Sequence, residues 1–204
     1  MIRIIFDNLQ SVKSQLQKNT TVQFTIRDPS ISTIRALFKL SSENNVDPSI
    51  KFSESISSQD IFWNSYRHVC LGGTFDHLHP GHKLLLTEAA HLASEKITIG
   101  IAHDDLLKNK SLKEFIQSYS IREKSVKNYL DSISKNQLEI DIQPIQDPVG
   151  PAGTIVDLDA IVLSEETVSG GEYAGLVGYV EFQIFTQYHD FHLRLTPRFY
   201  SAYF

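Results

Sequence analysis

From His68 onward, short apolar runs alternate with amphipathic segments, and this alternation limits the possible folds more than any other feature of the sequence. The expected strands are 68–73, 96–102, 138–145 and 158–164, and the expected helices are 80–94 and 121–133. Strands that alternate with helices favour a parallel, doubly wound α/β sheet, which binds ligands beyond the carboxyl ends of its strands. Functional residues are therefore expected just after Leu71, Ala102, Ile145 and Leu163.

Composition divides the chain into three parts. Residues 1–66 combine a strand-like run at 22–26, a helix-like stretch at 32–40 and a Ser-rich loop at 53–58, and we interpret them as a small α+β extension of unknown role. Residues 67–173 hold the alternating strands and helices. Residues 174–204 form an atypical aromatic-rich tail without lysine, in which only 180–185 alternates like a strand. A core strand followed by an interaction tail, or an end foreign to the rest of the chain, would each give this pattern.

Charge and cysteine content exclude several classes of function. The 19 Lys and Arg residues against 24 Asp and Glu residues give a formal net charge of -5, which disfavours nucleic-acid binding through bulk charge. Cys70 is the single cysteine, so an intrachain disulfide or a multi-cysteine zinc site is excluded and a reducing compartment is favoured. No apolar stretch approaches the roughly 18 residues that span a bilayer. We therefore expect a cytoplasmic protein that binds neither membrane nor nucleic acid.

The strongest local signal is the segment LGGTFDHLHPGH at 71–82. Its paired glycines permit a tight turn after the first strand, and Pro80 suits the first turn of the helix that follows. The N–H groups at such a helix start favour phosphate. His79 and His82 are spaced to donate N–H groups to phosphate oxygens, and Gly81 leaves room between them. Thr74 adds a hydroxyl and Asp76 an acceptor at the same position.

Taken singly, these residues have simpler interpretations. A glycine pair is commonly only a turn, and a histidine at a helix start is commonly a cap. Two histidines three apart also occur in metal sites, but Cys70 lies within the strand and is not placed to join them, so no protein metal site is expected. The lysines at 108, 110 and 113 also fit an ordinary solvated surface. The complete segment is far more specific than its parts.

GTFDHLHPGH resembles the H-x-G-H signature of the nucleotidylyltransferase superfamily in its G-T-F-D-x-x-H-x-G-H form. The segments at 104–123, 147–164 and 164–172 are similar to those of the phosphopantetheine adenylyltransferase family of the eukaryotic and archaeal type, in the same order. The resemblance covers about 68–173 and implies an α/β fold, a Rossmann-like doubly wound parallel sheet with a small N-terminal extension. It implies transfer of AMP from ATP to 4′-phosphopantetheine, which gives dephospho-coenzyme A and pyrophosphate in coenzyme A biosynthesis.

The resemblance assigns catalytic roles to His79, His82 and Lys110, with Lys108 as the alternative lysine. It implies that ATP or the second substrate is bound by a larger set: Gly72, Gly73, Thr74, Phe75, Asp76, Gly81, Lys108, Arg122, Ser164, Glu165, Glu166 and Thr167. The glutamates would meet ribose, metal-bound water or a cation, and a helix-surface charge is the alternative for Arg122. Mg²⁺ held mainly by the phosphates is the expected cofactor. Self-association and association with other enzymes of coenzyme A synthesis both remain open.

After Glu172 the sequence departs from the family pattern, because no I-S-S-T-x-x-R type motif follows. Two hypotheses result: an active adenylyltransferase, or a catalytically impaired, truncated or frame-altered relative that acts as a nucleotide-binding or interaction protein. The tail is expected to pack irregularly or stay mobile, and the chain is expected to be less stable and less active than one with a family-type end.

Overall fold

The computed structural model of the 204-residue chain is described for the larger part of its length. The described residues are 2–6, 12, 16, 21–26, 31–52, 66–108, 112–134, 138–147, 150–164 and 181–185.

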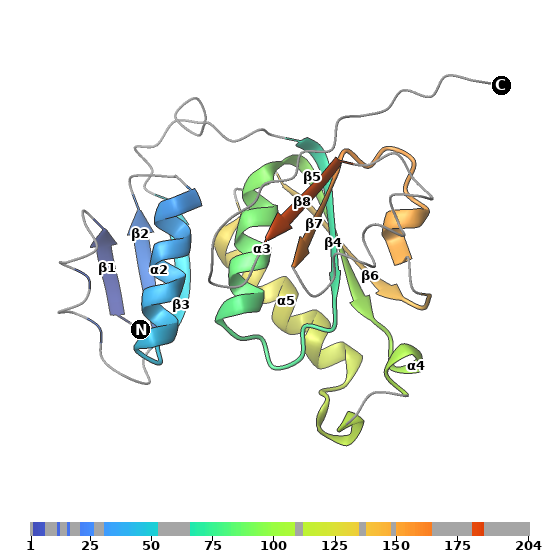
Figure 1. Cartoon of the computed structure of the whole chain (residues 1–204), viewed down its shortest axis with the longest axis horizontal. Helices are drawn as coiled ribbons and strands as arrows, with labels where there is room; N and C mark the ends of the chain where they lie inside the picture. Colours follow the sequence, from blue (N-terminus) through green and yellow to red (C-terminus); the bar gives the residue numbers. More distant parts are fainter. Residues whose placement is uncertain are drawn as a thin grey trace.

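A five-stranded, wholly parallel sheet forms the larger unit (Figure 1). Its strand order is β6-β5-β4-β7-β8, so the chain winds outward from the central β4 in both directions. The strands are β4 (Tyr66–Gly73), β5 (Ala93–Ala102), β6 (Glu139–Ile145), β7 (Ala160–Ser164) and β8 (Glu181–Phe185). This order confirms the predicted α/β, Rossmann-like sheet and brings the carboxyl ends of the strands to one edge.

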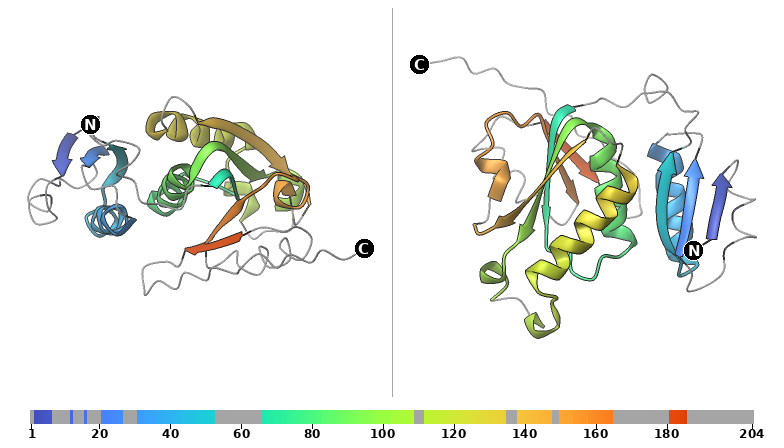
Figure 2. Two further views of the ribbon diagram at one scale, coloured as in Figure 1. Left: turned by 90° about the horizontal axis from the view of Figure 1, so that it is seen from above. Right: turned by 180° about the vertical axis from the view of Figure 1, so that it is seen from behind.

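Two long helices, α3 (Pro80–Leu92) and α5 (Tyr119–Ile133), cover one face of this sheet (Figure 2). Alternation along β4 and β5 directs one set of apolar residues to these helices, and together they form the main core: Val69, Leu71, Ile97, Ile99, Ile101, Leu86, Ala89, Val126 and Leu130. A smaller cluster on β4 and β7 joins Cys70, Ile161 and Leu163 with Leu158. Alternate residues along each strand therefore pack on opposite faces of the sheet, one set in the main core and the other in this smaller cluster.

Short helices occupy the connections at the carboxyl edge. They are α4 (Asp104–Leu107), η1 (Lys113–Phe115) and η2 (Gly150–Gly153). The loop expected after the second strand is therefore partly helical. Helix α3 ends at Leu92 and β5 begins directly at Ala93, so the predicted helix over 80–94 extends two residues too far.

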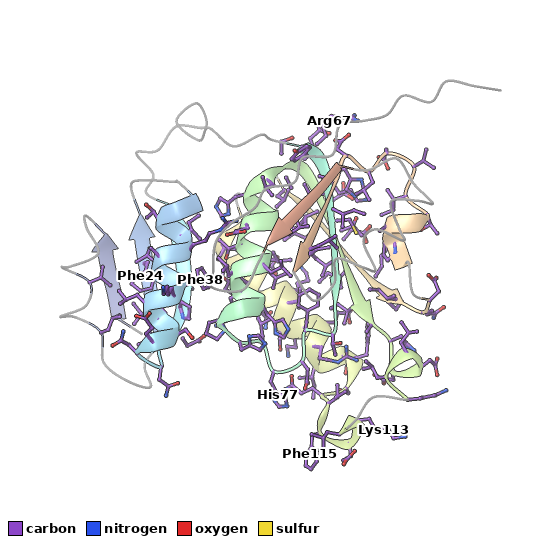
Figure 3. All side chains as sticks on the ribbon, in the orientation of Figure 1. Phe24, Phe38, Arg67, His77, Lys113 and Phe115 are labelled. Carbon is purple, nitrogen blue, oxygen red and sulfur yellow. The ribbon has the colours of Figure 1, made fainter. Side chains whose placement is uncertain are left out.

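The N-terminal unit is a second parallel sheet, of order β1-β2-β3. It consists of β1 (Ile2–Phe6), β2 (Thr21–Ile26), α2 (Ile31–Glu43) and β3 (Asp47–Phe52). Because parallel neighbours need a crossover, α2 connects β2 to β3 across the sheet. The unit is therefore α/β, and the predicted α+β character is wrong. Phe24 and Phe38 meet in its own buried core (Figure 3).

One part of the predicted tail is regular. β8 pairs with β7 in parallel register from Ala160↔Glu181 to Ser164↔Phe185 and is the outermost described strand on this side of the sheet. The expectation of irregular packing is therefore wrong for 181–185, and the rest of the tail lies outside the described residues. Among the helices described, none has both the length and the apolar character needed to cross a membrane.

Candidate functional site

The turn from β4 to α3 has a conformation that few sequences tolerate. Phe75 and His77 adopt φ of 52° and 42°, in the left-handed region that non-glycine residues rarely occupy. Phe75 is 1% exposed, so its ring fills the space beneath the turn. A Cβ on Gly73 would lie 3.1 Å from that ring, and glycine is needed here for the close approach. The strained turn is thus held in place by packing.

The two histidines lie together at the start of α3. His79 is the N-cap, and its Nδ1 accepts a hydrogen bond from the Gly81 N–H at 3.2 Å. Its ring stacks on His82 with centroids 3.8 Å apart and an interplanar angle of 26°. A Cβ on Gly81 would come within 3.1 Å of the His79 ring, so glycine makes this stacking possible. The arrangement exposes His79 and half-buries His82.

The surroundings of His82 hold its imidazole neutral at pH 7. Burial, followed by the nearby His79, lowers the pKa of His82 from 6.5 to about 4, and Asp76 opposes the shift. Its Nδ1 is buried and lacks a hydrogen-bond partner among the described residues. A buried polar atom without a partner is costly in a folded protein unless a ligand or water supplies one. The ring therefore offers phosphate oxygens a single N–H without a positive charge.

Arg122 clamps the turn from below. Its guanidinium is 0% exposed and donates to three carbonyl oxygens, those of Gln117 at 2.8 Å and of Thr74 and Ala102 at 2.9 Å each. A fourth bond reaches Asp104 Oδ1 at 3.0 Å. These bonds use four of its five N–H donors. The geometry supports a positioning role for Arg122, which ties the ends of β4 and β5 together. The alternative of a helix-surface charge is wrong because the side chain is buried, and the expected role in binding substrate stays a prediction.

A second set of bonds joins the turn to the segment before α5. The Gln117 N–H donates to Asp76 Oδ1 at 2.8 Å, and the His77 N–H donates to Gln117 Oε1 at 2.9 Å. The Asp76 carboxylate is thus engaged with backbone, which fixes the turn. Sequence reasoning missed Gln117 entirely, because an isolated glutamine in a polar loop carries no pattern.

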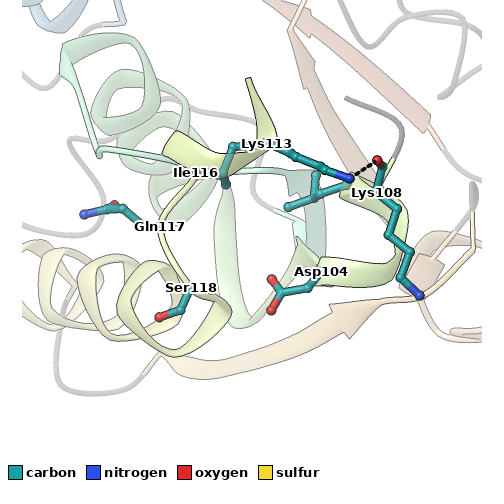
Figure 4. A pocket seen from close by; sticks show the side chains of 7 residues that line it. Asp104, Lys108, Lys113, Ile116, Gln117 and Ser118 are labelled. Carbon is teal, nitrogen blue, oxygen red and sulfur yellow. Dashed lines mark hydrogen bonds between the residues drawn. The ribbon is translucent and has the colours of Figure 1, made fainter. Parts of the chain in front are cut away.

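Beside this junction lies a cavity of about 240 Å³ (Figure 4). It is lined by Asp104, Leu107, Lys108, Lys113, Ile116, Gln117 and Ser118. Lys108 is exposed, pairs with Asp105 at 2.6 Å, and its pKa is raised by that bond. Lys113 Nζ donates to the Lys108 carbonyl at 3.2 Å. The ammonium groups of Lys108 and Lys113 therefore lie at this cavity. Two other residues of its wall connect it to the turn: Asp104 is bonded to Arg122, and Gln117 is bonded to His77.

Of the remaining predicted site residues, the structure describes some and not others. Gly72 is the penultimate residue of β4 and lies close to the end of β6, since a Cβ there would lie 3.2 Å from Ile145 Cδ1. Ser164 is the last residue of β7, at the predicted carboxyl edge. Four predicted residues, Lys110, Glu165, Glu166 and Thr167, lie outside the described residues. Asp104 was not among the predicted site residues, although its position just after β5 is the kind of place where function was expected.

Comparison with known proteins identifies the family. The sequence pattern described as cytidylyltransferase-like matches residues 70–196, more than half of the chain. The chain belongs to the cytidylyltransferase-like family. The match includes the glycine turn and the histidine pair, and it continues past residue 173 into the segment that composition set apart.

Curated relatives of this family member carry a more specific name. A Saccharomyces cerevisiae protein named phosphopantetheine adenylyltransferase is 34% identical over 179 residues, which cover 84% of this chain and 56% of that protein. A Pyrococcus abyssi protein of the same name is 39% identical over 105 residues, covering 52% of this chain and 65% of that protein. The chain therefore spans between half and two thirds of the length of these relatives.

A solved structure shares the fold. The crystal structure of a protein of unknown function from Archaeoglobus fulgidus aligns with a TM-score of 0.51 and 27% identity, covering 59% of this chain and 99% of that one. The archaeal alignment covers about half of this chain, whereas the yeast alignment covers 84% and so extends into the N-terminal unit.

Proposed function

We propose that this chain transfers the adenylyl group of ATP to 4′-phosphopantetheine, yielding dephospho-coenzyme A and pyrophosphate. The observation that carries the proposal is the stacked pair of His79 and His82 at the start of α3, with a buried His82 nitrogen that lacks a partner among the described residues. The shared name of the yeast and archaeal relatives supports adenylyl transfer over a role limited to nucleotide binding.

The chemistry asks the protein to align two phosphates. An oxygen of the phosphopantetheine phosphate attacks the α-phosphorus of ATP, a P–O bond forms, and the bond to the pyrophosphate leaving group breaks. The attacking oxygen is already anionic, so a general base is unnecessary. Catalysis then depends on alignment and on donors directed at the charge that develops on the α-phosphate and on pyrophosphate.

The described residues supply these donors at one edge of the sheet. In the proposal, the N–H groups at the start of α3 and the rings of His79 and His82 receive the ATP phosphates. The Thr74 hydroxyl orients the incoming phosphate, and Arg122 holds the Thr74 carbonyl in place. Lys108, or Lys110 in the segment beside it, neutralises charge from the cavity side. Ser164, Glu165, Glu166 and Thr167 are proposed to meet the nucleotide from the end of β7.

Mg²⁺ fits this site as a companion of the phosphates. The described residues contain no cluster of three acidic or histidine ligands, and Mg²⁺ commonly binds through substrate oxygens and one or two carboxylates. Asp104, with 62% of its side chain exposed at the cavity, is the carboxylate that would hold it there. When bound, the ion would neutralise negative charge on the phosphates.

The test is an assay of the purified chain with ATP, Mg²⁺ and 4′-phosphopantetheine, in which pyrophosphate and dephospho-coenzyme A are both measured. CTP in place of ATP tests the choice of nucleotide. Formation of both products from ATP is expected, and their absence would refute the proposal.

His82→Ala should lower kcat by about 10²- to 10³-fold, because a donor to the transition state is lost. His91→Ala is the matched control, since His91 lies on the same helix near its other end and bonds the Thr87 carbonyl. A His82 variant that keeps more than about a third of the wild-type turnover would remove this residue from the mechanism.

A further inference from the structure

The N-terminal unit rests on α3, the helix that begins with the histidine pair. Helix α2 packs along α3, and β3 contacts both α3 and α5 (Figures 1 and 2). Leu84 of α3 packs against the apolar core of the N-terminal unit, whereas Leu86 and Ala89 face the main core. Helix α3 therefore lies between the N-terminal unit and the five-stranded sheet, and it contacts both.

A buried ion pair forms the centre of this contact. Arg35 Nε donates to Glu88 Oε1 at 2.6 Å, and Arg35 Nη2 donates to Glu88 Oε2 at 3.1 Å. The Glu88 side chain is 1% exposed and that of Arg35 14%. Two parallel bonds between planar groups fix orientation as well as distance. The pair therefore sets both the position and the rotation of α3 relative to α2.

A second ion pair lies next to the histidines. Lys83, which directly follows His82, pairs with Asp47 at the start of β3, and its Nζ lies 5.5 Å from the centre of the Tyr129 ring. Tyr129 in turn bonds Thr87 of α3 through its hydroxyl at 2.7 Å. The first two turns of α3 are thus fixed to the N-terminal unit and to α5 by the contacts of Lys83 and Thr87, which lie one turn apart on the same face of the helix.

We propose that Arg35 and Glu88 are positioning residues that set where His79 and His82 meet the phosphates. This inference rests on the proposed adenylyl transfer. Glu88 follows His82 by six residues of one continuous helix, about 9 Å along its axis, so a displacement at Glu88 is transmitted to the helix start. Phosphoryl-type transfer is sensitive to such displacements, because a misplacement of about 1 Å costs up to roughly 10²-fold in rate.

The test separates positioning from stability with two variants. Arg35→Met leaves Glu88 buried without its cation, so both folding stability and turnover should fall. Arg35→Met/Glu88→Met removes both charges, so stability should return towards that of the wild type. In both variants kcat should fall about tenfold while the KM for ATP changes by less than about twofold. Lys127→Ala, which breaks the exposed Lys127–Asp131 pair on α5, should leave kcat unchanged.

The result that overturns the inference is a double variant with wild-type kcat, since the pair would then only neutralise a buried charge. A readout independent of turnover is the NMR titration of His82. Its pKa and ring resonances should move in both Arg35 variants and stay in place in Lys127→Ala. Unchanged titration in the Arg35 variants also overturns the inference. A wild-type chain without adenylyl transfer refutes the proposed function alone, and the titration still decides the positioning role.

Discussion

At the scale of single residues, Arg122 is more buried than its neighbour Ile121, the opposite of what their hydropathies predict. The Arg122 side chain is fully buried, whereas its neighbour Ile121 is 49% exposed. The guanidinium is buried because three carbonyl oxygens and one carboxylate surround it, and these acceptors come from segments far apart in the sequence. The motif alone predicted the histidine pair, since its members are close in sequence. Long-range bonds of the Arg122 kind have no local pattern.

Replacing Arg122 tests this clamp. Arg122→Lys should destabilise the fold by about 2–4 kcal/mol, because a single ammonium group does not reach all the acceptors of the planar fork. Turnover should fall with it, since Thr74 loses its anchor. Asp131→Asn is the control: it breaks only the exposed Lys127–Asp131 pair on α5 and should leave the unfolding free energy within about 0.5 kcal/mol. Equal losses of unfolding free energy in the two variants, measured by urea denaturation, would contradict this structural role of Arg122.

At the scale of elements, the sequence predicted strands with strong apolar runs and missed those that depend on partners. β4, β5, β6 and β7 were expected from their apolar runs in the sequence. The central residues of β4, β5 and β7 are buried, whereas those of β6 are half-buried or exposed. β3 was missed because DPSIKF begins with Asp47 and Pro48, and proline is tolerated here because β3 is an edge strand. β8 was recognised only as a brief alternation, since its place depends on pairing with β7.

The contact between β5 and β6 near the site gives a test at this scale. A Cβ on Gly100 would lie 2.7 Å from Ile145 Cδ1 and Cγ1, closer than packed atoms allow. Gly100→Ala should therefore cost about 1–3 kcal/mol through overpacking. Gly100→Ala/Ile145→Ala should be less destabilised than the sum of its two single variants, because the clash with Ile145 is gone and only the milder contact with Pro151 Cδ at 3.2 Å is left. Thermal denaturation of the four proteins measures this coupling, and additive losses would show that the strands do not meet in this way.

At the scale of the whole molecule, two α/β units, each with a parallel sheet, meet at helix α3. Local patterns predicted each unit in outline but not their contact, because Arg35 and Glu88 lie 53 positions apart and each resembles an ordinary surface charge in sequence. Only the packing of α2 on α3 shows that Glu88 is buried. Glu88 is buried only when both units pack together, so its pKa is a property of the assembled chain.

Glu88 should make the stability of the assembled chain depend on pH. Burial raises the pKa of Glu88 from 4.5 to about 7, against the opposing effect of Arg35. A carboxyl with a raised pKa binds its proton more tightly when folded, so this contribution is complete below pH 4.5 and is lost as pH rises through about 7. The wild type should therefore lose on the order of 2–3 kcal/mol between pH 5 and pH 8 that Glu88→Gln does not lose.

Thermal or urea unfolding of the wild type and Glu88→Gln at pH 5 and pH 8 measures this difference. His82 acts in the opposite direction, because its lowered pKa of about 4 makes stability rise with pH up to about 6.5. Both proteins contain His82, so its effect cancels in the comparison and the remaining difference belongs to Glu88. Parallel pH curves for the two proteins would mean that Glu88 keeps its ordinary pKa, because the two bonds from Arg35 would then offset the effect of burial in full.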